Sequence, residues 1–104
     1  MIRAILAAIA LTLPLQALAD EIFLTIHNRS SQSAYANTYP VGNDGEAIED
    51  NIGSQGDILP GTVVSYRLAS TACELVRVFV AMADESEMQT DVDLCKARSV
   101  VITD

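Results

Sequence analysis

Apolar and polar residues alternate in short runs along most of this chain, and each run ends in residues that favour turns. Alternation with a period of two is typical of a β-strand that buries one face. Short strands at regular spacing, with turn residues between them, predict an all-β fold: a small antiparallel β-sandwich or open barrel. We expect about six strands, at residues 22–27, 33–39, 62–68, 73–82, 88–95 and 98–103.

Residues 73–95 are predicted to form a β-hairpin with a polar turn centred on Asp84. In an antiparallel pair the numbers of facing residues have a constant sum, so pairing Cys73 with Cys95 sets the whole register. The register brings these residues face to face: Val76 with Val92, Val78 with Thr90, Val80 with Met88, Glu74 with Leu94, Arg77 with Asp91 and Phe79 with Gln89. One register therefore accounts for the cysteines, an apolar row and an oppositely charged pair.

This register predicts two specific contacts. Two cysteines in an exported chain most often pair, so we expect one disulfide between Cys73 and Cys95. Arg77 and Asp91 are expected to form a cross-strand ion pair on the face opposite the apolar row. A functional role for this pair requires a concave site around it, and otherwise it is an ordinary surface contact.

The N-terminal region predicts a secretory signal peptide over residues 1–19. Arg3 supplies a positive charge, an almost wholly apolar run follows, and Ala17-Leu18-Ala19 is a small-x-small cleavage site. The run is shorter than a membrane anchor needs, and Pro14 interrupts it. We therefore expect cleavage after Ala19, a periplasmic or secreted location, and no membrane span in the processed protein.

Length and charge restrict the number of domains and the classes of partner. Residues 20–104 suffice for a single β domain with one modest core. The whole chain has 14 acidic residues against 6 Lys and Arg, a formal net charge of −8, and the signal peptide contributes only a positive charge to this balance. Nucleic acid and anionic lipid are therefore not expected as partners.

An acidic, glycine-interrupted stretch over residues 43–57 is the candidate ligand site. We predict a loop there, with one helical turn at residues 47–51 and a Pro60-Gly61 turn shortly afterwards. Its oxygen-bearing side chains are candidate calcium ligands: Asp44, Glu46, Glu49, Asp50 and Asp57. Their spacing does not match an EF-hand loop. The alternative is a solvated acidic loop that keeps an edge strand, residues 33–39, soluble.

Candidate catalytic groups are few, because His27 is the only histidine and no serine lies in a nucleophile-elbow motif. Three hypotheses of function follow. The leading one is an exported, non-catalytic β-sandwich domain without a cofactor, which binds a protein or an envelope component. The second is a calcium-dependent binding module that uses the acidic stretch. The third is a small hydrolase that uses His27 and a serine.

Turn residues and parts of the cysteine-bounded hairpin form a set of landmarks along the chain. They are Asn28, Pro40, Asn51-Ile52-Gly53, Leu59-Pro60-Gly61, Cys73 followed by Val76-Arg77-Val78, and Asp93-Leu94-Cys95. Together they resemble a group of small exported bacterial proteins that is common in proteobacteria. The chain departs from the pattern of that group at Ala47-Ile48, Glu74-Leu75 and Asp84-Glu85. The resemblance implies a periplasmic, non-catalytic domain and carries over no active-site residue.

Overall fold

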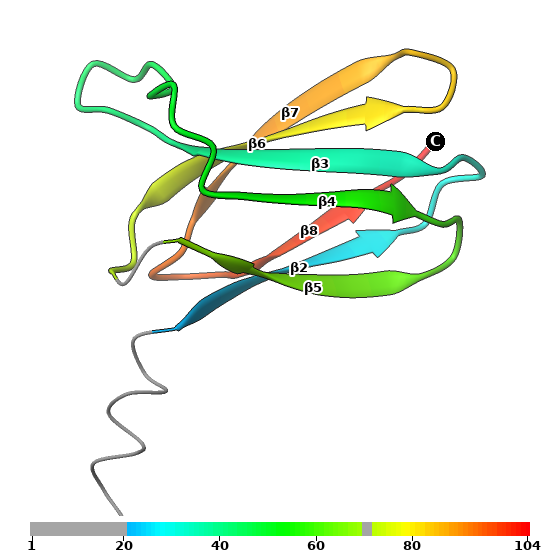
Figure 1. The fold of residues 1–104 in the computed structure, drawn as a ribbon, viewed down its shortest axis with the longest axis horizontal. Helices are drawn as coiled ribbons and strands as arrows, with labels where there is room; N and C mark the ends of the chain where they lie inside the picture. The colour runs from blue at the N-terminus through cyan, green and yellow to red at the C-terminus, as the bar shows by residue number, and fades with distance from the viewer. Residues whose placement is uncertain (1–20, 70–71) are drawn as a thin grey trace, which may run out of the picture.

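The computed structural model describes residues 21–69 and 72–104, and in this part of the chain seven strands form two stacked sheets (Figure 1). The strands are β2 (Ile22–Asn28), β3 (Ala34–Pro40), β4 (Gly53–Ile58), β5 (Val63–Leu68), β6 (Leu75–Met82), β7 (Glu87–Asp93) and β8 (Ser99–Ile102). One sheet has the order β5-β2-β8 and the other β4-β3-β6-β7. The prediction of a small all-β sandwich is confirmed. The predicted signal peptide, residues 1–19, lies outside the described residues.

The core lies between the two sheets and is built from the faces that the alternation predicts. In β2 the buried residues are Ile22, Leu24 and Ile26, and in β6 the buried row is Val76, Val78, Val80 and Met82. Burying these aliphatic side chains is the main source of stability in a domain of this kind. No helix among the described residues is both long and apolar enough to cross a membrane.

The predicted hairpin is confirmed in its register. Strands β6 and β7 pair antiparallel, with Val76 opposite Val92, Val78 opposite Thr90 and Val80 opposite Met88. Beyond the paired strands the Leu94 amide donates to the Glu74 carbonyl at 3.0 Å, which continues the same register. The disulfide between Cys73 and Cys95 closes the open end of the hairpin.

The first correction concerns residues 53–58, which form strand β4 where the sequence predicts a loop. This strand pairs with β3, so β3 lies inside its sheet, between β4 and β6, and the predicted edge strand is wrong. The reason is that β4 is mostly polar and glycine-containing and is held by tertiary contacts. A Cβ at Gly53 would lie 2.7 Å from Leu68 Cδ2 and 3.1 Å from Tyr66 Cε2 of β5, so a larger residue there would displace these buried side chains.

The predicted helical turn at residues 47–51 is also absent from the structure, where Ala47 forms a β-bridge with Val41 instead. A further difference is strand β8, which pairs parallel with β2 although the sequence predicts an antiparallel fold. After β7, the edge strand of the four-stranded sheet, the chain crosses to the other sheet. It then runs as β8 in the same direction as β2 (Figure 1). The direction of β8 therefore follows from this crossing.

Two buried polar contacts connect the elements. The hydroxyl groups of Thr38 and Tyr66 lie 2.7 Å apart and join the two sheets across the core. Burial raises the pKa of Tyr66, against the opposing effect of its hydrogen bond with Thr38. Asn28 is 1% exposed and connects the end of β2 to the turn between β4 and β5. That turn contains Pro60 and Gly61 as predicted, with Gly61 at a φ of 74°.

Candidate binding site on the outer face of the four-stranded sheet

The outer face of the four-stranded sheet contains an open cavity of about 910 Å³. Its floor consists of outward-facing side chains of β3, β6 and β7, and in β3 and β6 these alternate with buried core residues. These floor residues are Asn37, Tyr39, Arg77, Phe79 and Gln89. The strand pairing places Asn37, Phe79 and Gln89 in one cross-strand row, and Tyr39, Arg77 and Asp91 in the next.

Residues 41–52, here called the rim loop, form one wall of this outer-face cavity. The residues of the loop that line it are Glu46, Ala47, Ile48, Glu49 and Asn51. The Gly42 amide donates to the Glu46 carbonyl at 2.8 Å, and the Ile48 amide donates to the Pro40 carbonyl at 2.8 Å. The Asn51 side-chain amide donates to Asn37 Oδ1 at 2.8 Å, so the far end of the loop is anchored to the floor.

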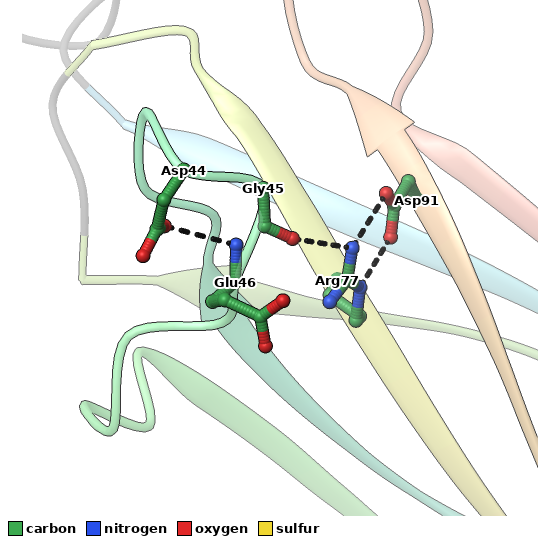
Figure 2. Close-up of polar contacts among 5 residues, drawn as sticks. All are labelled: Asp44, Gly45, Glu46, Arg77 and Asp91. Atoms are coloured by element: carbon green, nitrogen blue, oxygen red, sulfur yellow. Dashed lines mark hydrogen bonds and ion pairs between the residues drawn. The ribbon is translucent and has the colours of Figure 1, made fainter.

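Arg77 connects the floor to the rim loop, as Figure 2 shows. Its Nε donates to Asp91 Oδ1 at 2.7 Å, and its Nη2 donates to Asp91 Oδ2 at 3.1 Å. The same Nη2 donates to the Gly45 carbonyl at 3.1 Å. Gly45 has a φ of 82°, a conformation that strains any residue with a side chain. The predicted ion pair is therefore confirmed, and it also holds the loop.

The electrostatics of the ion pair follow from these contacts. The hydrogen bond from Arg77 lowers the pKa of the Asp91 carboxyl below its ordinary value, against a smaller opposing effect of burial. The hydrogen bond to Asp91 raises the pKa of Arg77; burial opposes this, and the negative charges of Asp91 and Glu46 add to it. Arg77 is thus a cation already neutralised within the site.

Replacing Asp91 by Asn is expected to reduce the loss of folding stability that the wild-type protein shows as the pH falls into the acid range. The folded pKa of Asp91 lies below its unfolded value, so the ion pair stabilises the fold above about pH 4. That contribution is lost as the pH falls through the folded pKa. The reduction is partial, because the Ser86 hydroxyl also lowers the pKa of Asp84, which the variant retains. Thermal melts followed by circular dichroism from neutral to strongly acidic pH measure the effect.

The matched control is Asp50→Asn, since the Asp50 carboxylate accepts no hydrogen bond within the described residues. This variant should lose stability in acid in the same way as the wild-type protein. If the melting temperatures of Asp91→Asn and the wild type instead fell by the same amount as the pH was lowered, the ion pair would not contribute to the stability of the fold.

The cavity also presents an aromatic pair on its floor and, on the floor and the rim loop, polar groups without side-chain hydrogen bonds among the described residues. The ring centroids of Tyr39 and Phe79 lie 5.6 Å apart and the ring planes meet at 81°, an edge-to-face arrangement. Within the described residues, the Gln89 amide and the carboxylates of Glu46 and Glu49 make no side-chain hydrogen bond. These groups are therefore available to a ligand.

Comparisons with protein-family models, curated proteins and solved structures gave no match. The resemblance to small exported proteobacterial proteins stays a prediction. Function is accordingly inferred from the chemistry of the outer-face cavity alone.

The predicted calcium ligands are spread over different parts of the structure. Glu46 and Glu49 line the cavity, while Asp44 Oδ1 accepts the Glu46 amide at 3.0 Å. Asp50 is exposed in the rim loop, and Asp57 belongs to β4. Residues 21–69 and 72–104 contain no group of three or more His, Cys, Asp or Glu side chains that could hold a metal ion. The calcium hypothesis stays untested, and no observation favours it.

His27 belongs to β2 and lies on the solvent-facing side of the three-stranded sheet. The outer-face cavity is on the other sheet, so His27 does not line it. Its side chain makes no hydrogen bond to a serine within the described residues. The structure therefore adds no support to the hydrolase hypothesis.

Sequence reasoning found one part of this site and missed the rest. Arg77 and Asp91 follow from the hairpin register, as does the position of Phe79 opposite Gln89. The contact of Phe79 with Tyr39 depends on the pairing of β3 with β6, which the sequence does not specify. The signal that could have indicated the site is the outward position of Phe79, because a solvent-facing aromatic at mid-strand has no role in the core.

Proposed function

We propose that this protein is an exported, non-catalytic binding module that recognises an envelope component or a protein partner through the outer-face cavity. The observation that carries the proposal is the Tyr39 and Phe79 ring pair in an open cavity. The same cavity is lined by Gln89, Glu46 and Glu49, whose side chains make no hydrogen bond among the described residues. Concave sites that combine aromatic surface with a few polar groups are the usual form of a ligand site.

Rigidity of the floor supports the proposal. Phe79 lies in the middle of β6, which is paired on both sides, and the hairpin that contains it is closed by the disulfide. Two hydrogen bonds hold the rim loop against this floor, one from Arg77 to the Gly45 carbonyl and one from Asn51 to Asn37. Two more, from Arg77 to Asp91 on β7, fix the Arg77 side chain. Side chains held in place in this way lose little conformational freedom on binding, which favours affinity.

The proposed location follows from the disulfide together with the predicted signal peptide. Cys73 and Cys95 are both exposed, and a disulfide in a small domain is compatible with an oxidising, exported environment. A periplasmic location places the cavity among the glycans, lipids and proteins of the envelope.

Co-sedimentation of the processed protein with isolated cell envelopes tests the proposal. Phe79→Ala and Tyr39→Ala are each expected to weaken binding by at least about fivefold, because loss of a central aromatic contact commonly costs more than about 1 kcal/mol. The matched control is Phe23→Ala, which removes a 47% exposed ring from the opposite sheet and should leave binding unchanged. Equal retention of all four proteins would contradict the proposal, provided that their melting temperatures show intact folds.

A further inference from the structure

The shape of the floor restricts how a ligand can be held. Strands β3 and β6 each pair with a neighbour on both sides, so their backbone amides and carbonyls are used within the sheet. A peptide that adds a strand to a sheet needs a free edge, and the one edge strand of the floor, β7, contributes only Gln89 to the cavity lining. Over β3 and β6 a ligand is therefore held by side chains alone.

The ring pair provides an apolar contact of limited size. The ring planes of Tyr39 and Phe79 are nearly perpendicular, and the two rings contact one another edge to face. Both residues are partly buried, and the cavity that they line is open to solvent. An aliphatic lipid chain needs a deep apolar slot, whereas the C–H face of a sugar ring needs only one accessible aromatic face.

Polar groups flank the rings at a spacing set by the sheet. Asn37 and Gln89 lie on either side of Phe79 in one cross-strand row, two strand spacings apart, or roughly 10 Å. Asn37 Oδ1 is occupied by Asn51, which leaves its Nδ2 as a donor, and the Gln89 amide offers both a donor and an acceptor. Hydroxyl groups at the two ends of a disaccharide match this arrangement.

Charge excludes one class of sugar. Arg77 is the only cationic side chain that lines the described cavity, and Asp91 and the Gly45 carbonyl already occupy it. The carboxylates of Glu46 and Glu49 face the same cavity without hydrogen-bond partners among the described residues. Carboxylates accept hydrogen bonds from hydroxyl and amine groups and repel uronates and phosphates.

We propose, as an extension of the proposed function, that the outer-face cavity binds an envelope glycan that has no negative charge, either neutral or rich in amino sugars. The sugar ring stacks on Phe79 and Tyr39. Asn37 and Gln89 hydrogen-bond its hydroxyl groups at the two ends of the row, and Glu46 and Glu49 accept hydrogen bonds from the rim-loop side.

The test is an NMR titration of the isotopically labelled, processed protein. The probes are hexamers of glucose, N-acetylglucosamine and glucosamine, with a galacturonate hexamer as the anionic comparison. We expect millimolar or tighter binding of at least one non-anionic probe, with shifted amides in β3, β6 and the rim loop. The galacturonate hexamer should give no shifts. Phe79→Ala and Gln89→Ala should weaken binding at least about fivefold, and Phe23→Ala should not.

Two outcomes overturn the glycan assignment. The first is the absence of shifts with all three non-anionic probes at millimolar concentration, and the second is binding that Phe79→Ala leaves unchanged. The envelope sedimentation separates this failure from failure of the proposed function. If envelopes still capture the protein through Phe79, and protease treatment of the envelopes abolishes capture, the cavity binds a protein and only the glycan assignment is wrong. If neither envelopes nor sugars bind, both proposals fail.

Discussion

Asn28→Ala is expected to destabilise the fold by about 3–4 kcal/mol, the largest effect of any single substitution considered. The Asn28 side-chain amide donates to the carbonyls of Gln32 at 2.9 Å and Ile58 at 2.9 Å, with a longer contact of 3.3 Å to Leu59. Its Oδ1 accepts the Ser30 amide at 3.0 Å and the Ser30 hydroxyl at 2.7 Å. Alanine would leave several buried polar groups without partners, each with its own desolvation penalty.

The position of Asn28 in the fold makes this loss more serious. Its backbone carbonyl also accepts the Gly61 amide at 2.7 Å, and its amide donates to the Thr62 carbonyl at 2.9 Å. One residue thus joins the end of β2, the start of the segment that leads to β3, and the turn between β4 and β5. In a domain of this size the expected loss corresponds to roughly 20 °C in melting temperature.

Chemical denaturation of Asn28→Ala beside the wild type measures the loss. Asn43→Ala is the control, because Asn43 is exposed and makes no side-chain hydrogen bond within the described residues. Asn28→Asp keeps the acceptor and replaces the donor by an oxygen, so it should be at least as destabilising as alanine at neutral pH. A loss below about 1 kcal/mol for Asn28→Ala would show that water replaces these hydrogen bonds.

Removal of the disulfide by Cys73→Ser with Cys95→Ser is expected to cost about 3 kcal/mol. The two cysteines are separated by 22 positions in sequence, and the bond restricts this loop in the unfolded chain. Both cysteines are exposed, so substitution leaves no buried cavity and the cost falls on the unfolded state. A loss of this size is a large share of the stability of a small domain.

Thermal melts with and without reductant measure the contribution of the disulfide. Reductant should lower the melting temperature of the wild-type protein to that of the double variant, and it should not change the melting temperature of the variant. A double variant that melted with the oxidised wild type would indicate that strand pairing alone determines the stability of the hairpin.

The hairpin and the sandwich class were predictable because their information is local. The register of β6 with β7 follows from two cysteines and a period-two row, and the structure reproduces each pair from Val76 with Val92 to Val80 with Met88. A slip by one residue would expose the whole row, so one register is strongly preferred. In β2 and β5 the buried residues likewise fall at alternate positions, as expected for strands that bury one face.

Strand β4 could not be predicted from its residues, because glycine and polar side chains give it no apolar alternation. Its existence depends on hydrogen bonds to β3 and on the close approach of Gly53 to Leu68 and Tyr66. Once β4 forms, β3 becomes an interior strand, so a single error about residues 53–58 also reversed the interpretation of β3. The parallel orientation of β8 could not be predicted either, because it depends on how the chain crosses from one sheet to the other.

The sequence by itself determined the all-β class, the disulfide-closed hairpin and the Arg77 and Asp91 pair, because each follows from neighbours along one or two adjacent strands. Only the tertiary structure placed Tyr39 beside Phe79 and the rim loop against them. That placement results from the pairing of β3 with β6 and from the hydrogen bonds of Arg77 and Asn51 to distant residues. No local pattern specifies which distant strand lies alongside, so the cavity follows from the packing of the whole domain.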